Sequence, residues 1–299
     1  MRRRRVESEF GIVLRGVGGI YNVQAAGDRV IRCRPRGRLK QQDLIILAGD
    51  RVEYTFIGQD EGVIEAVLPR GTILPRPAVA NIEQLILVTA CAEPEPQLLL
   101  MDKLLVLAES RQIHPVICLN KVDLVPDWIP EDLATTYAGV GYKVIKCSAK
   151  TGVGIDDLRR CLDGKLSSFA GPSGVGKSSL LNAIEPGLRL VTGAVSPKTG
   201  RGRQTTRQVE LLPLSFGGYV ADTPGFSQLQ LEGIDELELD RYFPDLYNIK
   251  SKCRFASCLH RLEPGCGVLE AVQNGTISSS RHNSYLVLLD ELEQARTRY

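Results

Sequence analysis

Residues 170–184 read AGPSGVGKSSLLNAI, and this stretch predicts a tight loop and a helix that follow the predicted strand SSFA at residues 167–170. Gly171, four intervening residues and then Gly176-Lys177-Ser178 form the spacing of a phosphate-binding loop. Its backbone N–H groups surround phosphate oxygens, Lys177 neutralises the β- and γ-phosphates, and the Ser178 hydroxyl ligates Mg²⁺. A glycine-rich turn with an accidental lysine is the alternative. The predicted phosphate-binding residues are Gly171, Pro172, Ser173, Gly174, Val175, Gly176, Lys177, Ser178 and Ser179.

Two motifs upstream indicate which base is bound. Asn120-Lys121-Val122-Asp123 ends the predicted strand HPVICLN, and Ser148-Ala149-Lys150 ends the predicted strand KVIKC. The Asp123 carboxylate would accept hydrogen bonds from the two N–H donors on the Watson–Crick edge of guanine. Adenine does not offer this pair of donors, so binding adenine would leave the carboxylate unpaired, at a cost of about 1–3 kcal/mol. Each motif alone fits a surface turn, but together with the phosphate loop they predict a GTP or GDP site. The predicted base-binding residues are Asn120, Lys121, Asp123, Ser148, Ala149 and Lys150.

A further motif downstream is typical of a γ-phosphate sensor. Asp222-Thr223-Pro224-Gly225 follows the predicted strand GGYVA, so Asp222 would hold Mg²⁺ through a water and the Gly225 amide would contact the γ-phosphate. The polar segment SPKTGRGRQTTRQVEL precedes it, and we expect Thr206 in this segment to join Ser178 as a magnesium ligand. A solvated loop without such a role is the alternative. Lys177, Thr206 and, in the same polar segment, Gln204 are the predicted catalytic residues.

The order of these motifs is unusual. The base-reading motifs precede the phosphate loop and the γ-phosphate motif follows it, which is a circular permutation of the usual G-protein order. In a parallel sheet the loops at the carboxyl ends of the strands converge whatever their order in the chain. We therefore expect an intact nucleotide site in a permuted α/β domain.

The regions on either side of this domain differ from it in their predicted secondary structure. Residues 8–72 contain short predicted strands broken by glycine-rich turns, which favours a small barrel such as an OB-fold. The predicted architecture is therefore multidomain, with an OB-fold β-barrel over 1–74, a circularly permuted α/β P-loop domain over 75–235 and a mostly α zinc-binding lobe over 236–299.

The formal charge of +2 excludes a bulk basic field, and no apolar run of membrane-spanning length occurs. We expect a cytoplasmic protein that is neither secreted nor membrane-bound.

The last region contains a motif suited to a metal. Three cysteines and a histidine have the spacing C-x4-C-x-H-x5-C, which fits a closed tetrahedral structural zinc site. Unligated thiols in a packed helix are the alternative. The predicted zinc ligands are Cys253, Cys258, His260 and Cys266. The remaining cysteines are scattered singly and are expected to be reduced, buried thiols: Cys33, Cys91, Cys118, Cys147 and Cys161.

Two basic clusters suggest contact with RNA phosphates. One lies in the barrel region, where alternate residues of a strand would share a face, and comprises Arg29, Arg32, Arg34, Arg36, Arg38 and Lys40. The other surrounds the predicted switch threonine and comprises Lys198, Arg201, Arg203 and Arg207. A solvated charged face is the alternative for each cluster.

The barrel, the permuted motifs NKVD, SAK, GPSGVGKSS, TTR and DTPGF, and the segment CRFASCLHRLEPGC together resemble the ribosome-small-subunit-dependent GTPases of the RsgA/YjeQ family. The resemblance covers about residues 8–290. It implies GTP hydrolysis stimulated by the small ribosomal subunit, a role in late maturation of that subunit, and an OB-fold and zinc lobe that bind ribosomal RNA.

One residue departs from the family pattern. Family members usually carry histidine directly before the paired threonines, whereas this chain has Gln204. The Gln204 amide is a candidate for orienting the hydrolytic water, and a solvent-facing loop residue is the alternative.

The sequence therefore predicts a GTPase that uses Mg²⁺, contains one structural Zn²⁺ and acts as a monomer on the small ribosomal subunit and its rRNA. Two alternatives belong to other classes. One is an RNA-binding assembly factor in which the nucleotide is mainly structural, and the other is an ATP-driven enzyme, which Asp123 disfavours. The arginine-rich start also leaves an organellar location open.

Overall fold

The computed structural model describes residues 8–41, 44–75, 77–188, 209–222, 231 and 233–296. These residues belong to two compact units. The first contains the described parts of Met1–Gln84, Cys161–Phe169 and Val195–Phe226, and the second those of Leu85–Arg160, Ala170–Ala194 and Ser227–Tyr299.

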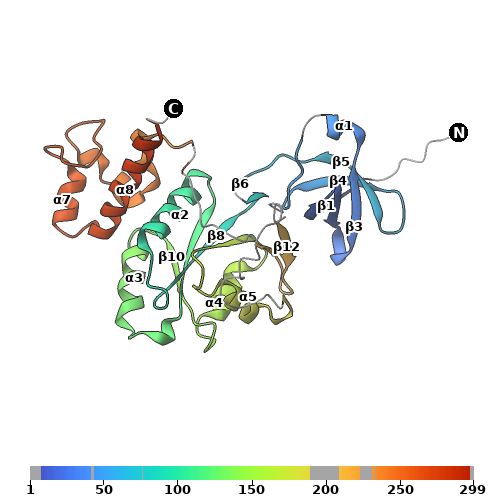
Figure 1. The fold of residues 1–299 in the computed structure, drawn as a ribbon, viewed down its shortest axis with the longest axis horizontal. Helices are drawn as coiled ribbons and strands as arrows, with labels where there is room; N and C mark the ends of the chain where they lie inside the picture. Colours follow the sequence, from blue (N-terminus) through green and yellow to red (C-terminus); the bar gives the residue numbers. More distant parts are fainter. Residues whose placement is uncertain are drawn as a thin grey trace, which may run out of the picture. The chain divides into compact units, whose positions relative to one another are not determined.

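The N-terminal strands form a closed barrel with the order β1-β2-β3-β5-β4 (Figure 1). Its strands are β1 (Glu9–Val17), β2 (Ile20–Gln24), β3 (Val30–Pro35), β4 (Arg51–Phe56) and β5 (Glu61–Val67). Burial alternates along β3, where Ile31 and Cys33 face the core and their neighbours face out. At the barrel wall, a Cβ on Gly11 would lie 2.5 Å from Val23 Cγ1, so glycine allows this close approach. The OB-like barrel expected from the sequence is confirmed.

Short elements accompany the barrel. They are η1 (Ala26–Asp28), α1 (Gly37–Gln41) and the two-stranded sheet of β6 (Ile73–Pro75) and β7 (Ala78–Ala80). Helix α1 corrects one expectation, because Arg38 and Lys40 lie in this helix and do not continue the alternation of β3.

The P-loop region contains a six-stranded sheet of order β10-β9-β8-β11-β13-β12. Its strands are β8 (Gln84–Ala90), β9 (His114–Asn120), β10 (Lys143–Lys146), β11 (Leu166–Ala170), β12 (Glu210–Pro213) and β13 (Tyr219–Asp222). The β9–β10 and β11–β13 pairs are parallel, and the edge strand β12 is antiparallel to β13. All residues of β8 and β11 are buried, as expected for inner strands of a parallel sheet.

Helices follow the strands in the expected alternation. They are α2 (Leu98–Ser110), η2 (Val122–Leu124), α3 (Trp128–Ala138), α4 (Ile155–Leu162), α5 (Lys177–Ile184) and η3 (Pro186–Leu188). Helix α3 has no counterpart among the elements predicted from the sequence, because it buries only Pro130 and Tyr137 and so shows little apolar periodicity.

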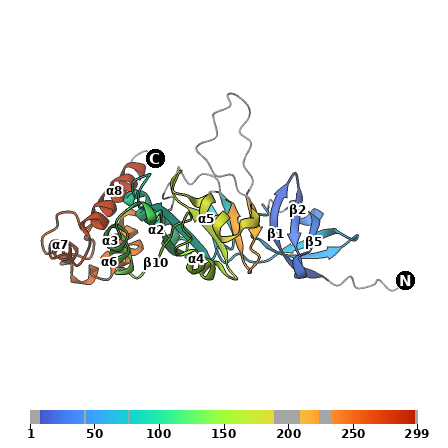
Figure 2. The same cartoon turned by 90° about the horizontal axis from the view of Figure 1, so that it is seen from below.

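The C-terminal lobe is helical, as Figure 2 shows for α6, α7 and α8. Its elements are η4 (Glu236–Tyr242), α6 (Pro244–Tyr247), η5 (Lys250–Lys252), α7 (Gly267–Gln273) and α8 (Ser279–Arg296). Phe243, Tyr285 and Leu288 pack in a core that also includes Val106 of α2. The lobe therefore shares its core with the helix that follows β8.

A buried arginine joins the same helices. Arg281 of α8 is 1% exposed, and its guanidinium donates to Asp102 Oδ1 of α2 at 2.6 Å and to Asp245 Oδ1 of α6 at 2.7 Å. It also lies 4.7 Å from the centre of the Phe243 ring. Asp102 is fully buried, and burial raises its pKa while the charge of Arg281 opposes this shift. Each charge therefore depends on the other for compensation.

No helix in the described ranges combines the length and the apolar character that a bilayer crossing requires.

Candidate nucleotide site and metal centre

The loop after β11 has the backbone that its glycines predict. Gly171, Gly174 and Gly176 have φ angles of +142°, +83° and +94°, which side-chain-bearing residues rarely adopt. A Cβ on Gly171 would lie 2.1 Å from the carbonyl oxygen of Val88, so glycine also allows this loop to lie against β8. Helix α5 begins at Lys177, which places its N-terminus directly after the loop. Ser178 and Ser179 lie in the first turn of this helix, half-buried.

Lys177 points back into the loop. Its Nζ donates to the carbonyl oxygens of Gly171 at 2.8 Å and Pro172 at 2.7 Å. Burial lowers the pKa of Lys177, because its ammonium group has lost part of its hydration. The two carbonyl dipoles compensate the ammonium charge only in part, and a phosphate group inside the loop would compensate it more fully.

Asn120 connects the base-reading motif to the phosphate loop. Its side chain is 2% exposed, and Nδ2 donates to the carbonyl oxygen of Val175 at 2.7 Å. A Cβ on Gly176 would lie 2.4 Å from the same Nδ2, so only glycine permits this hydrogen bond without displacement. Two motifs that lie 55 positions apart in the chain thus share one direct contact.

The base-reading residues lie close together. The hydroxyl of Ser148, which is buried, donates to Asp123 Oδ1 at 2.6 Å, whereas Asp123 is exposed. The amide of Ala149 points toward Asn120 Oδ1 at 3.4 Å. Lys121 has a left-handed backbone with φ +62°, and its ammonium group donates to the carbonyl oxygen of Glu93. This arrangement leaves the Asp123 carboxylate accessible but held in place at one oxygen.

Some predicted residues lie outside this description. Gln204, Thr206 and Gly225 are not among the described residues, and Asp222 is described only as the last residue of β13. The second basic cluster, Lys198, Arg201, Arg203 and Arg207, also lies outside the described ranges. Lys150 is exposed at the end of the Ser148-Ala149-Lys150 motif.

The C-terminal cysteines and histidine come together as one cluster. The potential ligand atoms of Cys253, Cys258, His260 and Cys266 all lie within 4.8 Å of one another. His260 Nδ1 lies 3.6 Å from Cys253 Sγ and 3.5 Å from Cys266 Sγ, and the two sulfurs are 3.9 Å apart. A tetrahedral zinc with Zn–S bonds of about 2.3 Å and a Zn–N bond of about 2.0–2.1 Å requires donor separations of about 3.6 to 3.8 Å, and the three distances among Cys253, His260 and Cys266 are close to these values.

Residues outside the cysteine motif support the cluster. Asp240, 2% exposed, lies with Oδ2 3.3 Å from His260 Nε2 and also pairs with Lys250. Burial raises the pKa of Asp240, but the hydrogen bonds from His260 and Lys250 outweigh this effect and lower it. A carboxylate behind a ligating histidine fixes its ring orientation. Asp240 could not be recognised from the sequence, because 20 positions separate it from His260 and no local motif marks it.

A second carboxylate shapes the loop that carries the ligands. Glu263 accepts from the backbone N–H groups of Leu259 at 2.7 Å and Arg261 at 2.7 Å. These bonds lower the pKa of Glu263 against the opposing effect of burial.

The five other cysteines are free and buried, as expected.

The first basic cluster is partly neutralised. Arg29 donates to Asp60 Oδ1 at 2.9 Å, and Arg36 pairs with Glu65. No hydrogen bond or ion pair of the Arg32 or Arg34 side chain occurs within the described part of the chain. The cluster is therefore not a uniform phosphate-binding row, and Arg32 and Arg34 are its available members.

Comparison with known proteins identifies the family. The RsgA GTPase family model matches residues 67–232, and the RsgA N-terminal domain model matches residues 10–64. The small ribosomal subunit biogenesis GTPase RsgA of Moorella thermoacetica is 53% identical over 94% of this chain and 97% of its own length. This chain belongs to the RsgA GTPase family. The family expected from the sequence motifs is confirmed, and with it a GTP hydrolase that binds guanine nucleotide.

Solved structures agree with this RsgA-family assignment. The crystal structure of YjeQ from Thermotoga maritima matches with a TM-score of 0.83 and 41% identity over 96% of this chain and 99% of that chain. The structure of YloQ, described as a circularly permuted GTPase, also matches with a TM-score of 0.83, at 36% identity over the full length of both chains. The permuted fold inferred from motif order is thus confirmed.

Proposed function

We propose that this chain hydrolyses GTP to GDP and phosphate during late maturation of the small ribosomal subunit, binds rRNA and is stimulated by the subunit. The names of its relatives support the biological role, since they are described as small ribosomal subunit biogenesis GTPases. The single contact that carries the molecular proposal is the hydrogen bond from Asn120 to Val175, because it joins the base-reading and phosphate-binding motifs into one site.

In the proposed site each motif has a separate task. Asp123 selects guanine by accepting its N–H donors, and Ser148 holds the carboxylate in position. Lys177 leaves the carbonyl oxygens of Gly171 and Pro172 to neutralise the phosphates, and the loop amides donate to their oxygens. Ser178, Thr206 and Asp222 would hold Mg²⁺, which supplies additional charge neutralisation when bound. Catalysis then consists mainly of positioning and electrostatic stabilisation.

The proposal also covers the zinc centre, the oligomeric state and the domain boundaries. We assign Zn²⁺ a structural role at Cys253, Cys258, His260 and Cys266, and we expect a monomer in the cytoplasm. The predicted boundaries remain 1–74 for the barrel, 75–235 for the permuted GTPase domain and 236–299 for the zinc lobe.

Measuring GTP turnover with and without purified small ribosomal subunits tests this function. The proposal predicts slow turnover by the protein alone and a marked increase with subunits, because a partner would complete the catalytic site. Large ribosomal subunits at the same concentration are the control. An unchanged rate with small subunits, together with normal subunit binding, would favour the alternative in which the nucleotide is mainly structural.

A further inference from the structure

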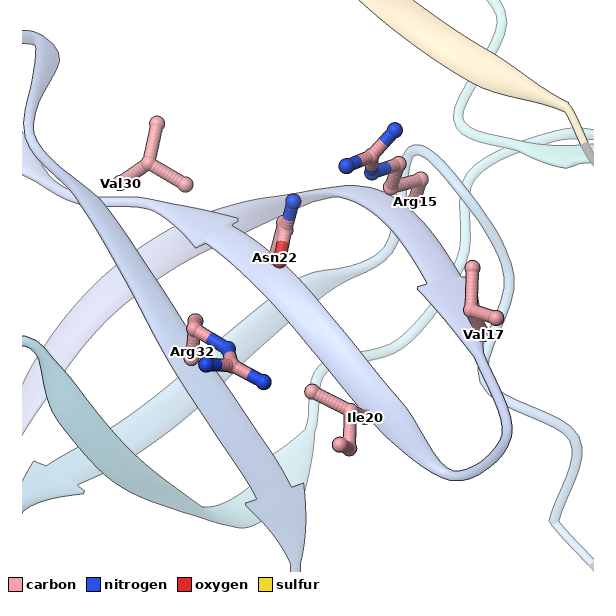
Figure 3. Close-up of a pocket in the computed structure, with 6 residues that line it drawn as sticks. All are labelled: Arg15, Val17, Ile20, Asn22, Val30 and Arg32. Carbon is pink, nitrogen blue, oxygen red and sulfur yellow. The ribbon is translucent and has the colours of Figure 1, made fainter.

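Arg281 differs from the arginines of the barrel in being buried. Arg15 and Arg32 line an open groove on the barrel and are exposed (Figure 3). Arg281 of α8 is the largest fully buried side chain of the described residues, and its ion-pair partners are Asp102 of α2 and Asp245 of α6. Burying these charges is costly, and apolar side chains of similar volume could pack the same core. The network therefore indicates a task for Arg281 besides stability.

Asp102 is the point at which Arg281 reaches helix α2. Its Oδ1 accepts hydrogen bonds from Arg281 Nη1 at 2.6 Å and from the Tyr137 hydroxyl of α3 at 3.1 Å. The guanidinium carbon of Arg281 also lies 5.6 Å from the centre of the Tyr137 ring. Both views of the fold show α2 beside α8 (Figures 1 and 2). Helices α2, α3 and α8 therefore meet at one buried point.

The other face of α2 lies against the phosphate loop. Leu100, Met101 and Leu104 are on the side of the helix opposite Asp102, because successive residues of an α-helix are about 100° apart. These three side chains line a small cavity together with residues of β8 and with Pro172 of the phosphate loop. A displacement of α2 would therefore change the packing around Pro172.

The loop 91–97, which leads directly into α2, reaches the base-reading motif. The carbonyl oxygen of Glu93 accepts a hydrogen bond from the Lys121 ammonium group. Pro94 lies beside the phosphate loop, since its Cδ would be 3.7 Å from a Cβ on Gly174. Because the loop is short and ends at the helix, the place of α2 sets the place of this loop. Helix α2 thus connects the Arg281 network to both nucleotide-binding motifs.

We propose that Arg281 is a positioning residue for guanine nucleotide binding, which acts through Asp102 on helix α2. With α2 held in place, Pro172 and Lys121 keep the positions that the phosphates and the base require. Nucleotide binding must in turn strengthen the attachment of α8 to α2, because the coupling of two sites is reciprocal. Positioning by Arg281 goes beyond the proposed function and rests on it only where Lys121 and the phosphate loop are assigned to the nucleotide.

Isothermal titration calorimetry of the full-length chain with GDP tests this role, under conditions in which circular dichroism shows each variant to be folded. Arg281→Met should weaken GDP binding about 2- to 30-fold, the range for residues that couple sites without touching the ligand. A non-hydrolysable GTP analogue should lose affinity by the same factor, because it shares the base and the α- and β-phosphates with GDP. Arg281→Lys keeps a cation near Asp102 and should recover part of the affinity.

Two further variants separate positioning from stability. Adding Asp102→Asn to Arg281→Met removes the uncompensated carboxylate and should regain stability, but GDP binding should stay weak because α8 still lacks its contact with α2. Val268→Ala opens a cavity in the core of the same lobe, in α7, and should lower stability without changing GDP affinity.

Hydrogen exchange of the unchanged protein tests the reciprocal effect without a substitution. GDP should slow the exchange of the α8 amides around Arg281, and this protection should disappear in Arg281→Met.

Three results would overturn the positioning role. They are a GDP affinity that follows the free energy of unfolding across all these variants, a loss confined to the GTP analogue, and α8 exchange that GDP leaves unchanged. Lys177→Ala separates this role from the proposed function. If Lys177→Ala binds GDP as the unchanged protein does, the assigned nucleotide site is wrong, and with it the role of Arg281. If Lys177→Ala binds weakly and Arg281→Met binds normally, only positioning by Arg281 is wrong.

Discussion

Because Asn120 lies against the phosphate loop, we expect alanine at Gly176 to lower the free energy of unfolding by more than backbone strain alone would. Alanine at Gly176 or at Gly174 meets nearly the same backbone, with φ angles of +94° and +83°, so each substitution should cost about 1–2 kcal/mol in strain. Their surroundings differ, because a Cβ on Gly176 would lie 2.4 Å from Asn120 Nδ2, whereas on Gly174 the nearest atom, in Pro94, is 3.7 Å away. Gly174→Ala is therefore a matched control for strain alone.

The added Cβ of Gly176→Ala must displace the Asn120 side chain. This movement breaks the 2.7 Å hydrogen bond to Val175 and leaves buried polar groups unpaired, at a cost of about 1–3 kcal/mol. The free energy of unfolding of the nucleotide-free protein should thus fall by about 1–3 kcal/mol more for Gly176→Ala than for Gly174→Ala. Denaturant unfolding followed by circular dichroism measures this difference without interference from phosphate contacts.

A double-mutant cycle isolates the contact. Asn120→Ala removes the amide group that the new Cβ would clash with. The loss in free energy of unfolding of the Asn120→Ala, Gly176→Ala double variant should therefore be smaller than the sum of the two single losses by at least about 1 kcal/mol. Equal losses for Gly176→Ala and Gly174→Ala, with additive costs in the cycle, would refute the claim that the two motifs are joined at this point.

Three further predictions concern other parts of the molecule. Arg281→Met should lower the free energy of unfolding by about 3–5 kcal/mol because Asp102 would be left buried and uncompensated, and adding Asp102→Asn should restore part of the loss in denaturant unfolding. Asp240→Asn should weaken zinc binding about 10- to 100-fold, as measured by competition with a chelator, because the carboxylate no longer holds the His260 ring. In the unchanged protein, zinc affinity should fall as pH falls, because burial raises the pKa of the Cys258 thiol to about 12 and zinc must displace its proton. If Gln204 orients the hydrolytic water, Gln204→Ala should reduce subunit-stimulated turnover, and an unchanged rate would remove Gln204 from catalysis.

The sequence predicts the local motifs of this protein well, for a physical reason. The phosphate loop, the alternating barrel strands and the buried strands β8 and β9 follow from glycine spacing and apolar patterning, which act over a few residues. The small barrel follows from short strands broken by glycine-rich turns, and the permuted fold follows from the order of the nucleotide-binding motifs.

Contacts between distant segments could not be predicted in the same way. The bond from Asn120 to Val175, the support of His260 by Asp240 and the pairing of Arg29 with Asp60 each join residues whose separation carries no periodic signal. The Arg29–Asp60 pair also reduces the net positive charge of the basic cluster in the barrel, which the sequence alone presents as uniformly basic.

The Asp123 carboxylate decides which base the site accepts, and Asp123→Asn is the variant that changes this carboxylate alone. Asp123 is exposed, so this nearly isosteric change should leave the fold intact. Nucleotide competition by isothermal titration calorimetry should show weaker binding of guanosine nucleotides and a shift in preference toward xanthosine nucleotides, because the Asn amide can donate to the carbonyl that xanthine carries in place of the guanine amino group. If Asp123→Asn kept the original preference for guanosine over xanthosine nucleotides, Asp123 would not be the residue that selects the base.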